Sequence, residues 1–221
     1  MNTKISFIPK IIYEDKDFLI VNKPPGMVVH HDLHHHHDTL WDFVKNKLQF
    51  ENNIKKTGIV HRLDKPTSGL LVIARNLSTW LFFKKKMQKR KIKRKYFALV
   101  QGIVKEKKFT VDVSLTKPGK YKRVHTKPTG AKAITHFQII QIFAKRKQTL
   151  LECELETGRT HQIRGHLKFL NFPIINDPLY QGGKNNYIYL HAYYLSLPHP
   201  LTKKEMEFKI DLPLYFQKKL S

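Results

Sequence analysis

Residues 61–74 read His61-Arg62-Leu63-Asp64-Lys65-Pro66-Thr67-Ser68-Gly69-Leu70-Leu71-Val72-Ile73-Ala74. The apolar run at positions 70–74 is rich in branched side chains, which predicts a buried strand. A short strand is also predicted at residues 59–60, and the residues between have turn chemistry because proline presets φ and glycine tolerates positive φ. Asp64 is therefore expected on a tight loop between two core elements, a position where catalytic groups are often found.

Spacing alone leaves two interpretations of Asp64. In one, the aspartate caps the turn through its own backbone and Arg62 is a surface charge. In the other, Asp64 is a catalytic carboxylate. The string HRLDKPTSGLLVIAR favours the second, because it resembles the central motif of the RluA-type pseudouridine synthases, whose aspartate is the catalytic nucleophile. The same resemblance matches Arg62 to the family arginine that enters the space left by a flipped base.

The composition predicts a globular protein with a polyanionic partner. Hydrophobic residues make up 41% and aromatic residues 11% of the 221 residues, which is enough for a sizeable core and excludes a disordered tail. Lysine and arginine number 41 against 17 acidic residues, a formal net charge of +24, so nucleic acid is the simplest partner. A lysine-rich bias of the source genome is the alternative, and both can hold together.

The single cysteine and the lack of long apolar segments indicate the cellular compartment. Cys153 excludes an intrachain disulfide and fits a reducing compartment, and its surroundings predict a core-facing strand position without catalytic chemistry. The N-terminal residues contain no apolar stretch of signal-peptide length, and no window approaches a membrane span. We therefore expect a cytoplasmic protein without a membrane partner.

Residues 11–29 predict a hairpin that ends at Pro24-Pro25-Gly26. The string VNKPPGMVVH resembles the opening of the family's catalytic domain, and too few residues precede it for the S4 RNA-binding domain that many members carry.

Residues 30–38 then hold six histidines and two aspartates. Imidazole suits transition metals, but neighbours in one loop cannot all converge on one ion, so we favour a solvated loop and predict no metal site.

Two helices are predicted on either side of the central motif. One covers residues 40–48 after a cap at Asp38 or Thr39, and one covers residues 79–88 after a start at Asn76 or Ser78. The basic run at residues 89–95 is either a phosphate-contact patch, with Lys95 as its last member, or a solvated face.

The second half of the chain is dominated by strand patterns. Strands are predicted at residues 92–102, 109–115, 131–143, 148–156 and 206–210, with a turn at residues 117–120. The expected fold class is α+β: the pseudouridine synthase catalytic fold, a mixed and mostly antiparallel sheet with flanking helices and a central active-site cleft. The string KYFALVQG resembles the family's second motif, whose tyrosine stacks on the target base, which gives Tyr96. From the residues alone, Tyr96 is an ordinary strand aromatic.

The string ETGRTHQIR at residues 156–164 predicts a strand end followed by a helix capped by Thr160. An arginine in the first turn adds to the positive end of the helix dipole, so an anionic neighbour is expected for Arg164. The string resembles the family's third motif, whose last arginine pairs with the catalytic aspartate, which implies that Arg164 pairs with Asp64. Gly165 stands where a branched apolar residue is common in the family.

Two later segments extend the resemblance. Asn176 stands where the family usually has glycine, and asparagine tolerates the left-handed region better than most residues. The string LHA at residues 190–192 resembles the closing motif, whose apolar residue packs under the target base, which gives Leu190. His191 is expected to be structural.

The resemblance runs from about residue 11 to residue 216, and we read residues 1–221 as one catalytic domain. It implies an isomerase that converts uridine to pseudouridine without cofactor or metal, acting as a monomer. It looks closest to members acting on large-subunit (23S) ribosomal RNA; transfer RNA, and a non-catalytic RNA-binding or ribosome-assembly protein, are the alternatives. The implied catalytic residues are Asp64, Arg164 and Tyr96, and the expected RNA-binding residues are Arg62, His61, Leu190, Lys95 and Arg159.

Overall fold

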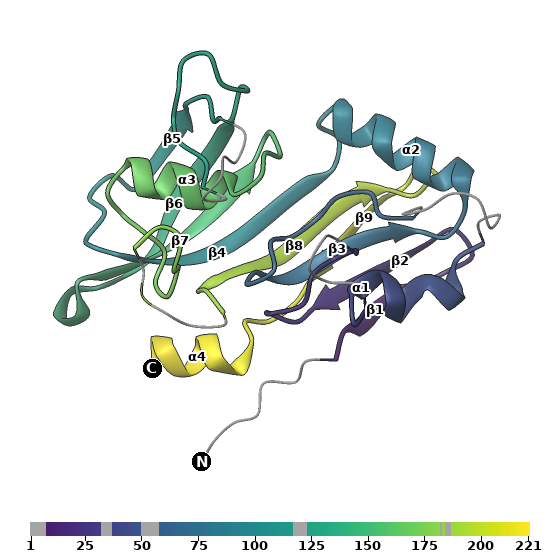
Figure 1. Cartoon of the computed structure of the whole chain (residues 1–221), viewed down its shortest axis with the longest axis horizontal. Coiled ribbons are helices and arrows are strands. Elements are labelled where there is room, and N and C mark those ends of the chain that lie inside the picture. The colour runs from purple at the N-terminus through teal and green to yellow at the C-terminus, as the bar shows by residue number, and fades with distance from the viewer. Residues whose placement is uncertain (1–7, 32–36, 50–57, 117–122, 182, 184–186) are drawn as a thin grey trace. The chain divides into compact units, whose positions relative to one another are not determined.

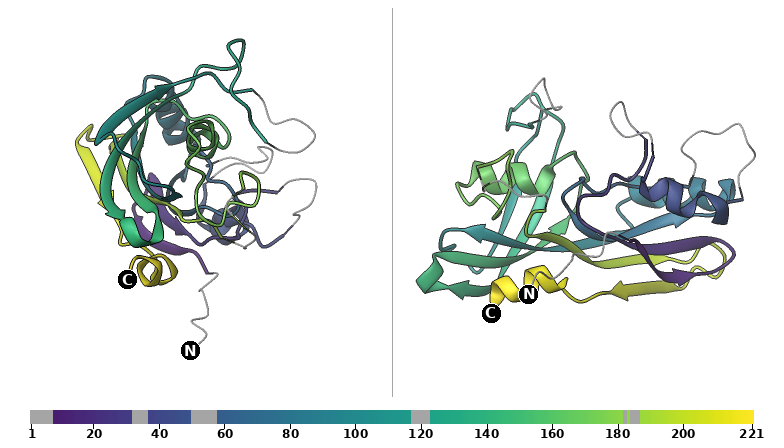
Figure 2. Two further views of the ribbon diagram at one scale, coloured as in Figure 1. Left: turned by 90° about the vertical axis from the view of Figure 1, so that its left-hand side faces the viewer. Right: turned by 60° about the horizontal axis from the view of Figure 1, so that its bottom comes forward.

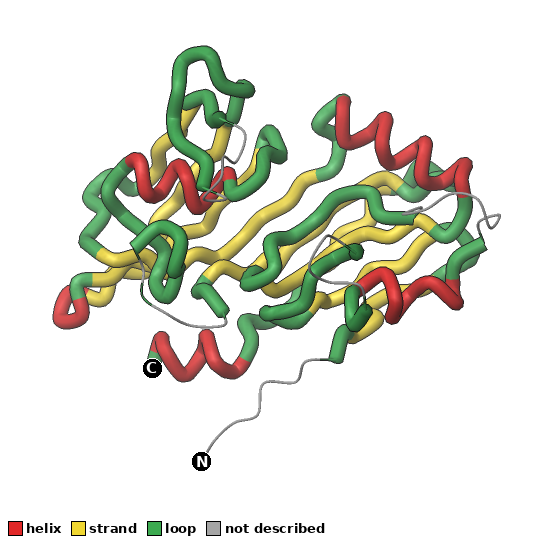
Figure 3. The backbone as a smooth tube through the Cα atoms, viewed as in Figure 1, coloured by secondary structure: helices red, strands yellow, loops and turns green. Residues whose placement is uncertain are grey.

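The computed structural model describes residues 8–31, 37–49, 58–116, 123–181, 183 and 187–221 (Figure 1). Contacts divide the chain into two compact units: unit 1 is Met1–Ile92 with Tyr193–Ser221, and unit 2 is Lys93–Ala192. Each unit combines an antiparallel sheet with helices, so the predicted α+β class is confirmed (Figure 3). None of the helices in the described ranges has the length and apolar character needed to span a membrane.

Unit 1 is built on the hairpin and the central motif. Strands β1 (Lys10–Glu14) and β2 (Phe18–Lys23) form the predicted hairpin, and β2 pairs antiparallel with β3 (Ser68–Ala74). Strand β8 (Leu190–Pro198) begins in unit 2 and continues into unit 1, where it pairs with β9 (Glu205–Lys209). The buried strand predicted at residues 70–74 is the body of β3.

The helices of unit 1 differ from prediction at their ends. Helix α1 (Leu40–Val44) is capped by Thr39 and passes into the 3₁₀ helix η1 (Lys45–Lys47), so the helix predicted over residues 40–48 is shorter than expected. Helix α2 (Leu77–Gln88) begins after Asn76, whose side chain accepts a hydrogen bond from the Thr79 amide. The C-terminal tail forms α4 (Leu214–Leu220).

The core of unit 1 lies between its sheet and α2. Phe18 of β2 meets Phe83 of α2 edge to face, with ring centroids 5.4 Å apart. Leu70 and Val72 of β3 belong to the same apolar cluster as these rings. Because β3 is fully buried along its length, the turn that precedes it is held by the core.

Unit 2 is a four-stranded antiparallel sheet with one helix (Figure 2). Its strands are β4 (Lys93–Gln101), β5 (Lys108–Asp112), β6 (Ile134–Phe143) and β7 (Gln148–Leu155), in the spatial order β4-β7-β6-β5. The 3₁₀ helix η2 (Ala144–Arg146) lies in the β6–β7 turn. The predicted strands are confirmed, although β6 begins at residue 134, because Ala131 forms an isolated bridge with Leu115. The turn predicted at residues 117–120 lies outside the described residues.

Helix α3 (Gln162–Phe169) follows β7, and its start corrects one prediction. Its N-cap is His161 in the left-handed region (φ 54°) without a side-chain cap, so the cap predicted at Thr160 is wrong. Gly165 is explained by packing, since a Cβ there would lie 2.9 Å from Val124 Cγ2. Asn176 has φ 63°, which confirms the left-handed position expected for a residue that replaces glycine.

Candidate active site

The turn that carries Asp64 is held by backbone hydrogen bonds. The Thr67 amide donates to the Asp64 carbonyl at 3.0 Å, and the Gly26 amide donates to the Lys65 carbonyl at 2.8 Å. Asp64 is half-buried and Arg62 is exposed, so both are open to solvent at the start of β3. The strand predicted at residues 59–60 is only an isolated bridge from Ile59 to Ile73.

A buried lysine lies directly behind this turn. Lys23, the last residue of β2, is 0% exposed. Its Nζ donates to the carbonyl oxygens of Pro24 and Met27 at 2.9 Å each and to that of Lys65 at 3.2 Å. The sequence analysis gave this residue no role, and the available signal was a lysine at the end of an apolar strand, just before Pro24-Pro25-Gly26.

The charge of Lys23 is coupled to Asp64. Burial lowers the pKa of the Lys23 ammonium to about 7, and the charge of the Asp64 carboxylate opposes that shift. Asp64 thus lies on a rigid turn that is open to a ligand, in front of a buried lysine.

Unit 2 holds one more of the predicted residues, Tyr96, on the inner face of β4. Tyr96 is 5% exposed and pairs in register with Cys153 of β7. Burial raises the pKa of the Cys153 thiol well above its usual value, which agrees with the core position predicted for this cysteine. His61, the third predicted residue of the turn region of unit 1, accepts a hydrogen bond at Nε2 from the Val72 amide at 3.4 Å.

Arg164 has the anionic neighbour that its place in α3 predicts, and that neighbour is Asp177. Nε donates to Asp177 Oδ2 at 2.7 Å and Nη2 donates to Oδ1 at 2.9 Å, with the two side chains 2% and 0% exposed. The guanidinium also lies 5.2 Å from the Tyr180 ring centroid. Sequence analysis missed Asp177, which directly follows the left-handed Asn176. The pairing of Arg164 with Asp64 joins residues of different units and remains a prediction.

Gln162 organises the loop that leads into α3. Its Oε1 accepts from the Thr157 hydroxyl at 2.8 Å and from the Arg159 amide at 3.0 Å, while its Nε2 donates to the Ile134 carbonyl at 2.9 Å. The exposed Arg159 side chain donates from Nε to the Lys132 carbonyl at 3.0 Å. The loop is thus fixed to β6, and Arg159 is presented at the surface.

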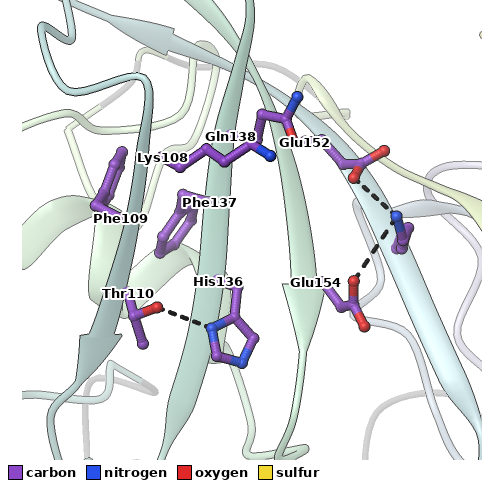
Figure 4. A pocket seen from close by; sticks show the side chains of 9 residues that line it. Lys108, Phe109, Thr110, His136, Phe137, Gln138, Glu152 and Glu154 are labelled. Carbon is purple, nitrogen blue, oxygen red and sulfur yellow. Dashed lines mark hydrogen bonds and ion pairs between the residues drawn. The ribbon is translucent and has the colours of Figure 1, made fainter.

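Lys95 lies on the opposite face of β4, in a groove of about 350 Å³. Figure 4 shows other side chains that line this groove, among them Glu152 and Glu154. The Lys95 Nζ is 3.0 Å from Glu152 and 3.7 Å from Glu154, so two carboxylates offset its charge. Phe109 and Phe137 stack in the same groove with ring centroids 5.0 Å apart. The ion pairs weaken the case for Lys95 as a phosphate contact.

Leu190, predicted to pack under the target base, is buried at the start of β8.

The predicted absence of a histidine metal site concerns residues 30–37, of which residues 32–36 lie outside the described part of the chain. Nε2 of His31 donates to Asp42 Oδ2 at 2.8 Å, and Asp42 completes the capping box of α1 with Thr39. His37 contacts only the neighbouring Asp38 among the residues described, at 2.9 Å. These contacts fit a helix cap and a solvated loop.

A second cluster of metal-ligand residue types joins Asp15, Asp17 and His199, whose ligand atoms lie within 4.8 Å of one another. Nδ1 of His199 accepts from the amides of Leu201 and Thr202, at 3.1 and 3.3 Å. Nε2 must then carry the ring proton and donate it to Asp15 Oδ2, at 3.1 Å. The ring therefore has no lone pair left for a cation, and the cluster is a hydrogen-bonded link.

Comparison with known proteins agrees with the fold and the motifs. The family described as RNA pseudouridylate synthase matches residues 17–169. The chain is 40% identical over 210 residues to the uncharacterized RNA pseudouridine synthase YlyB of Bacillus subtilis (strain 168), covering 92% of this chain and 69% of that protein. It is 37% identical over 219 residues to ribosomal large subunit pseudouridine synthase D of Buchnera aphidicola subsp. Schizaphis graminum (strain Sg), covering 91% and 69%.

Solved structures support the same fold. Human RNA Pseudouridylate Synthase Domain Containing 4 matches with a TM-score of 0.76 at 22% identity, covering 95% of this chain and 91% of that chain. Human RNA Pseudouridylate Synthase Domain Containing 1 gives 0.73 at 24% identity, covering 94% and 84%. The chain therefore belongs to the RNA pseudouridylate synthase family. Within that family it is an RNA pseudouridine synthase of the RluA type, an isomerase.

Proposed function

We propose that this protein isomerises uridine in large-subunit ribosomal RNA, with Asp64 as the nucleophile. The observation that carries the proposal is the position of Asp64: its turn precedes a strand that is fully buried in the core of unit 1, and the buried Lys23 Nζ donates to the carbonyl of the adjacent Lys65. The RNA target is supported by relatives named ribosomal large subunit pseudouridine synthase D, which reach 37% identity. A cytoplasmic monomer with one catalytic domain belongs to the same proposal.

The chemistry needs an ionised carboxylate. Isomerisation breaks the bond between uracil N1 and ribose C1′, the base turns, and C5 bonds to C1′; C5 then loses a proton and N1 gains one. Asp64 either attacks C1′ or promotes loss of a ribose proton to form a glycal, and both roles require the charged form. The uracil must first leave its stack, which costs least in loops.

The remaining assignments follow from the resemblance. In the proposal, Arg164 pairs with Asp64, Tyr96 stacks on the target base, and Leu190 packs under it. Arg62 fills the space that the flipped base leaves. His61 and Arg159 contact the RNA, where the net charge of +24 supplies affinity and little selectivity. A contact from Lys95 requires the RNA to displace its ion pairs with Glu152 and Glu154.

The test is pseudouridine mapping by reverse transcription in RNA from a deletion strain that carries each variant. Asp64→Asn should abolish the modification and leave RNA affinity within a few-fold, because the amide keeps the shape and loses the charge. Asp211→Asn, which removes an exposed carboxylate, is the matched control and should retain full modification. A signal that persists with Asp64→Asn contradicts the assignment.

The same map separates the alternative targets. Loss of a signal confined to large-subunit ribosomal RNA supports the proposal, while loss confined to transfer RNA assigns the enzyme to that substrate. If wild-type protein binds RNA and restores no pseudouridine in either pool, the non-catalytic alternative holds.

A further inference from the structure

Unit 2 contains two deeply buried arginines that differ in their partners. Arg164 is 2% exposed and its charge is met by the Asp177 carboxylate. Arg94 is 9% exposed, and its only hydrogen bond within the described residues runs from Nη2 to the Thr157 carbonyl, at 3.3 Å. No carboxylate within the described ranges pairs with it, and Nε has no hydrogen-bond partner there.

An unpaired buried guanidinium is a costly arrangement. Buried charges in proteins are normally paired, and unsatisfied buried donors are rare. Burial lowers the pKa of Arg94, with Tyr96 opposing the shift, yet an arginine stays protonated at neutral pH. Strand β4 therefore keeps a cation in its inner face, and none of the described residues supplies a carboxylate to stabilise it.

The loop in front of Arg94 leaves the guanidinium within reach of solvent. Gly158 is exposed, and a Cβ built on it would lie 2.8 Å from Arg94 Nη1 and 3.3 Å from Nη2. Any other residue at position 158 would crowd the guanidinium. Gln162 holds the flanking residues of this loop, since it binds the Thr157 hydroxyl and the Arg159 amide. The guanidinium thus lies against the exposed backbone of one glycine, in a loop that Gln162 holds on both sides.

Arg94 shares a strand face with Tyr96, because residues two apart on a strand point the same way. Their Cα atoms are about 6.6 Å apart by strand geometry. We propose that Arg94 and the loop at Gly158 form an anion site that binds one phosphate of the substrate RNA. The inference rests on the proposed function and adds to it a backbone contact beside the base-stacking tyrosine. Guanidinium groups suit phosphate because their forked donors bind two oxygens at once.

The competing explanation is purely structural: Arg94 ties β4 to the loop through the Thr157 carbonyl. The two explanations predict different effects on the melting temperature when Arg94 is replaced. Removing a structural tie lowers the melting temperature. Removing an unpaired buried cation leaves the melting temperature unchanged or raises it, and the cost falls on RNA binding.

The test compares Arg94→Met with wild type, each in the full chain and in an Asp64→Asn background, so that binding is measured without turnover. The probe is an in vitro transcript of large-subunit ribosomal RNA. We expect Kd to rise about tenfold or more, since hydrogen bonds to charged groups contribute most. The slope of log affinity against log salt should fall by about 0.7 to 0.9, one phosphate contact. The melting temperature should not fall.

Lys145→Met is the matched control, because it removes the same charge from the exposed turn at the far end of the β6–β7 hairpin. Its Kd should stay within about twofold of the parent at equal salt, as a distant screened charge requires. Gly158→Ala is an independent probe, since its Cβ would displace the guanidinium. Gly158→Ala should raise Kd in the parent protein and should not raise it further in the Arg94→Met variant. Residues that form one site show this non-additivity.

An unchanged Kd for Arg94→Met overturns the inference. The inference is also overturned if the loss of affinity disappears when binding is measured well below the melting temperature of the variant, because partial unfolding then explains the loss. It is overturned too if Gly158→Ala weakens RNA binding further in the Arg94→Met variant. Failure of the proposed function looks different: wild-type protein then forms no pseudouridine, whatever Arg94 does. If wild type is active and Arg94→Met binds normally, only the anion site fails.

Discussion

The ammonium of Lys23 and the carbonyl of Lys65 are joined by a hydrogen bond of 3.2 Å across 42 residues of sequence. This bond ties the end of β2 to the residue directly after Asp64. The same ammonium holds the carbonyls of Pro24 and Met27, so one buried cation connects the Pro-Pro-Gly segment to the turn of the central motif. The buried side chain of Lys23 therefore helps to fix the turn that carries the candidate nucleophile, together with the backbone bonds of that turn.

Lys23→Met should reduce catalysis more than RNA binding. The methionine fills the volume, but it loses the donor to the Lys65 carbonyl and the positive charge that interacts with Asp64. A small misplacement of a reacting group can cost about 100-fold in rate. We expect kcat to fall by about tenfold to 100-fold while KM changes by a few-fold, measured by single-turnover and steady-state pseudouridine formation.

Lys16→Met is the control for that variant, because Lys16 is exposed in the turn between β1 and β2. It removes the same charge from unit 1 and should retain the wild-type kcat. A wild-type kcat in Lys23→Met would show that the buried ammonium does not position Asp64.

The Arg164–Asp177 pair should be the most sensitive polar pair of unit 2. Breaking a buried pair by removing one partner leaves a buried charge uncompensated and costs about 3–5 kcal/mol. For a chain of this size, each kcal/mol shifts Tm by about 2–4 °C. We expect Asp177→Leu to lower Tm by about 6–20 °C, measured by calorimetry or circular dichroism.

The double variant Arg164→Met with Asp177→Leu separates folding from function. Replacing both charges with apolar groups removes the desolvation cost, so Tm should recover most of the loss. Pseudouridine formation should not recover, since the proposal gives Arg164 a further role at Asp64. Recovered activity in the double variant would show that Arg164 serves the fold alone.

His166 should make the protein sensitive to acid. Its Nε2 donates to the Val113 carbonyl and its Nδ1 accepts from the Thr135 hydroxyl, both at 2.9 Å, so the buried ring is neutral. Burial lowers its pKa, against the opposing bond to Val113 and the charge of Asp112. With the folded pKa below the unfolded value near 6.5, this contribution to stability is full above about pH 6.5 and is lost as pH falls through the folded pKa.

The measurement is Tm of wild type and His166→Gln between pH 7.5 and about 5. Wild type should lose more Tm than the variant over this interval, because glutamine does not titrate. His136→Gln, which removes an exposed ring, should follow the wild-type curve. Parallel curves for wild type and His166→Gln would contradict the buried neutral state.

Local patterns in the sequence account for most of the elements. Period-two apolar residues and turn residues predicted the β1–β2 hairpin, β3 and the β6–β7 hairpin, because side-chain alternation and φ preferences act over a few residues. Asn176 adopts the left-handed region, as expected for an asparagine at a position where the family usually has glycine. The errors fall at ends, as with the cap at His161, where hydrogen bonds within the loop outweigh side-chain preference.

The sequence by itself determined the family, the position of Asp64 on a turn before a buried strand, and the need of Arg164 for an anion. Only the tertiary structure decided that this anion includes Asp177, that Lys23 is buried against the carbonyl of Lys65, and that Arg94 is buried without a carboxylate partner in the described residues. The reason is physical: the energy of a charge depends on burial and on neighbours brought close by folding. Asp177 lies 13 residues from Arg164, Lys65 lies 42 residues from Lys23, and Thr157 lies 63 residues from Arg94 along the chain.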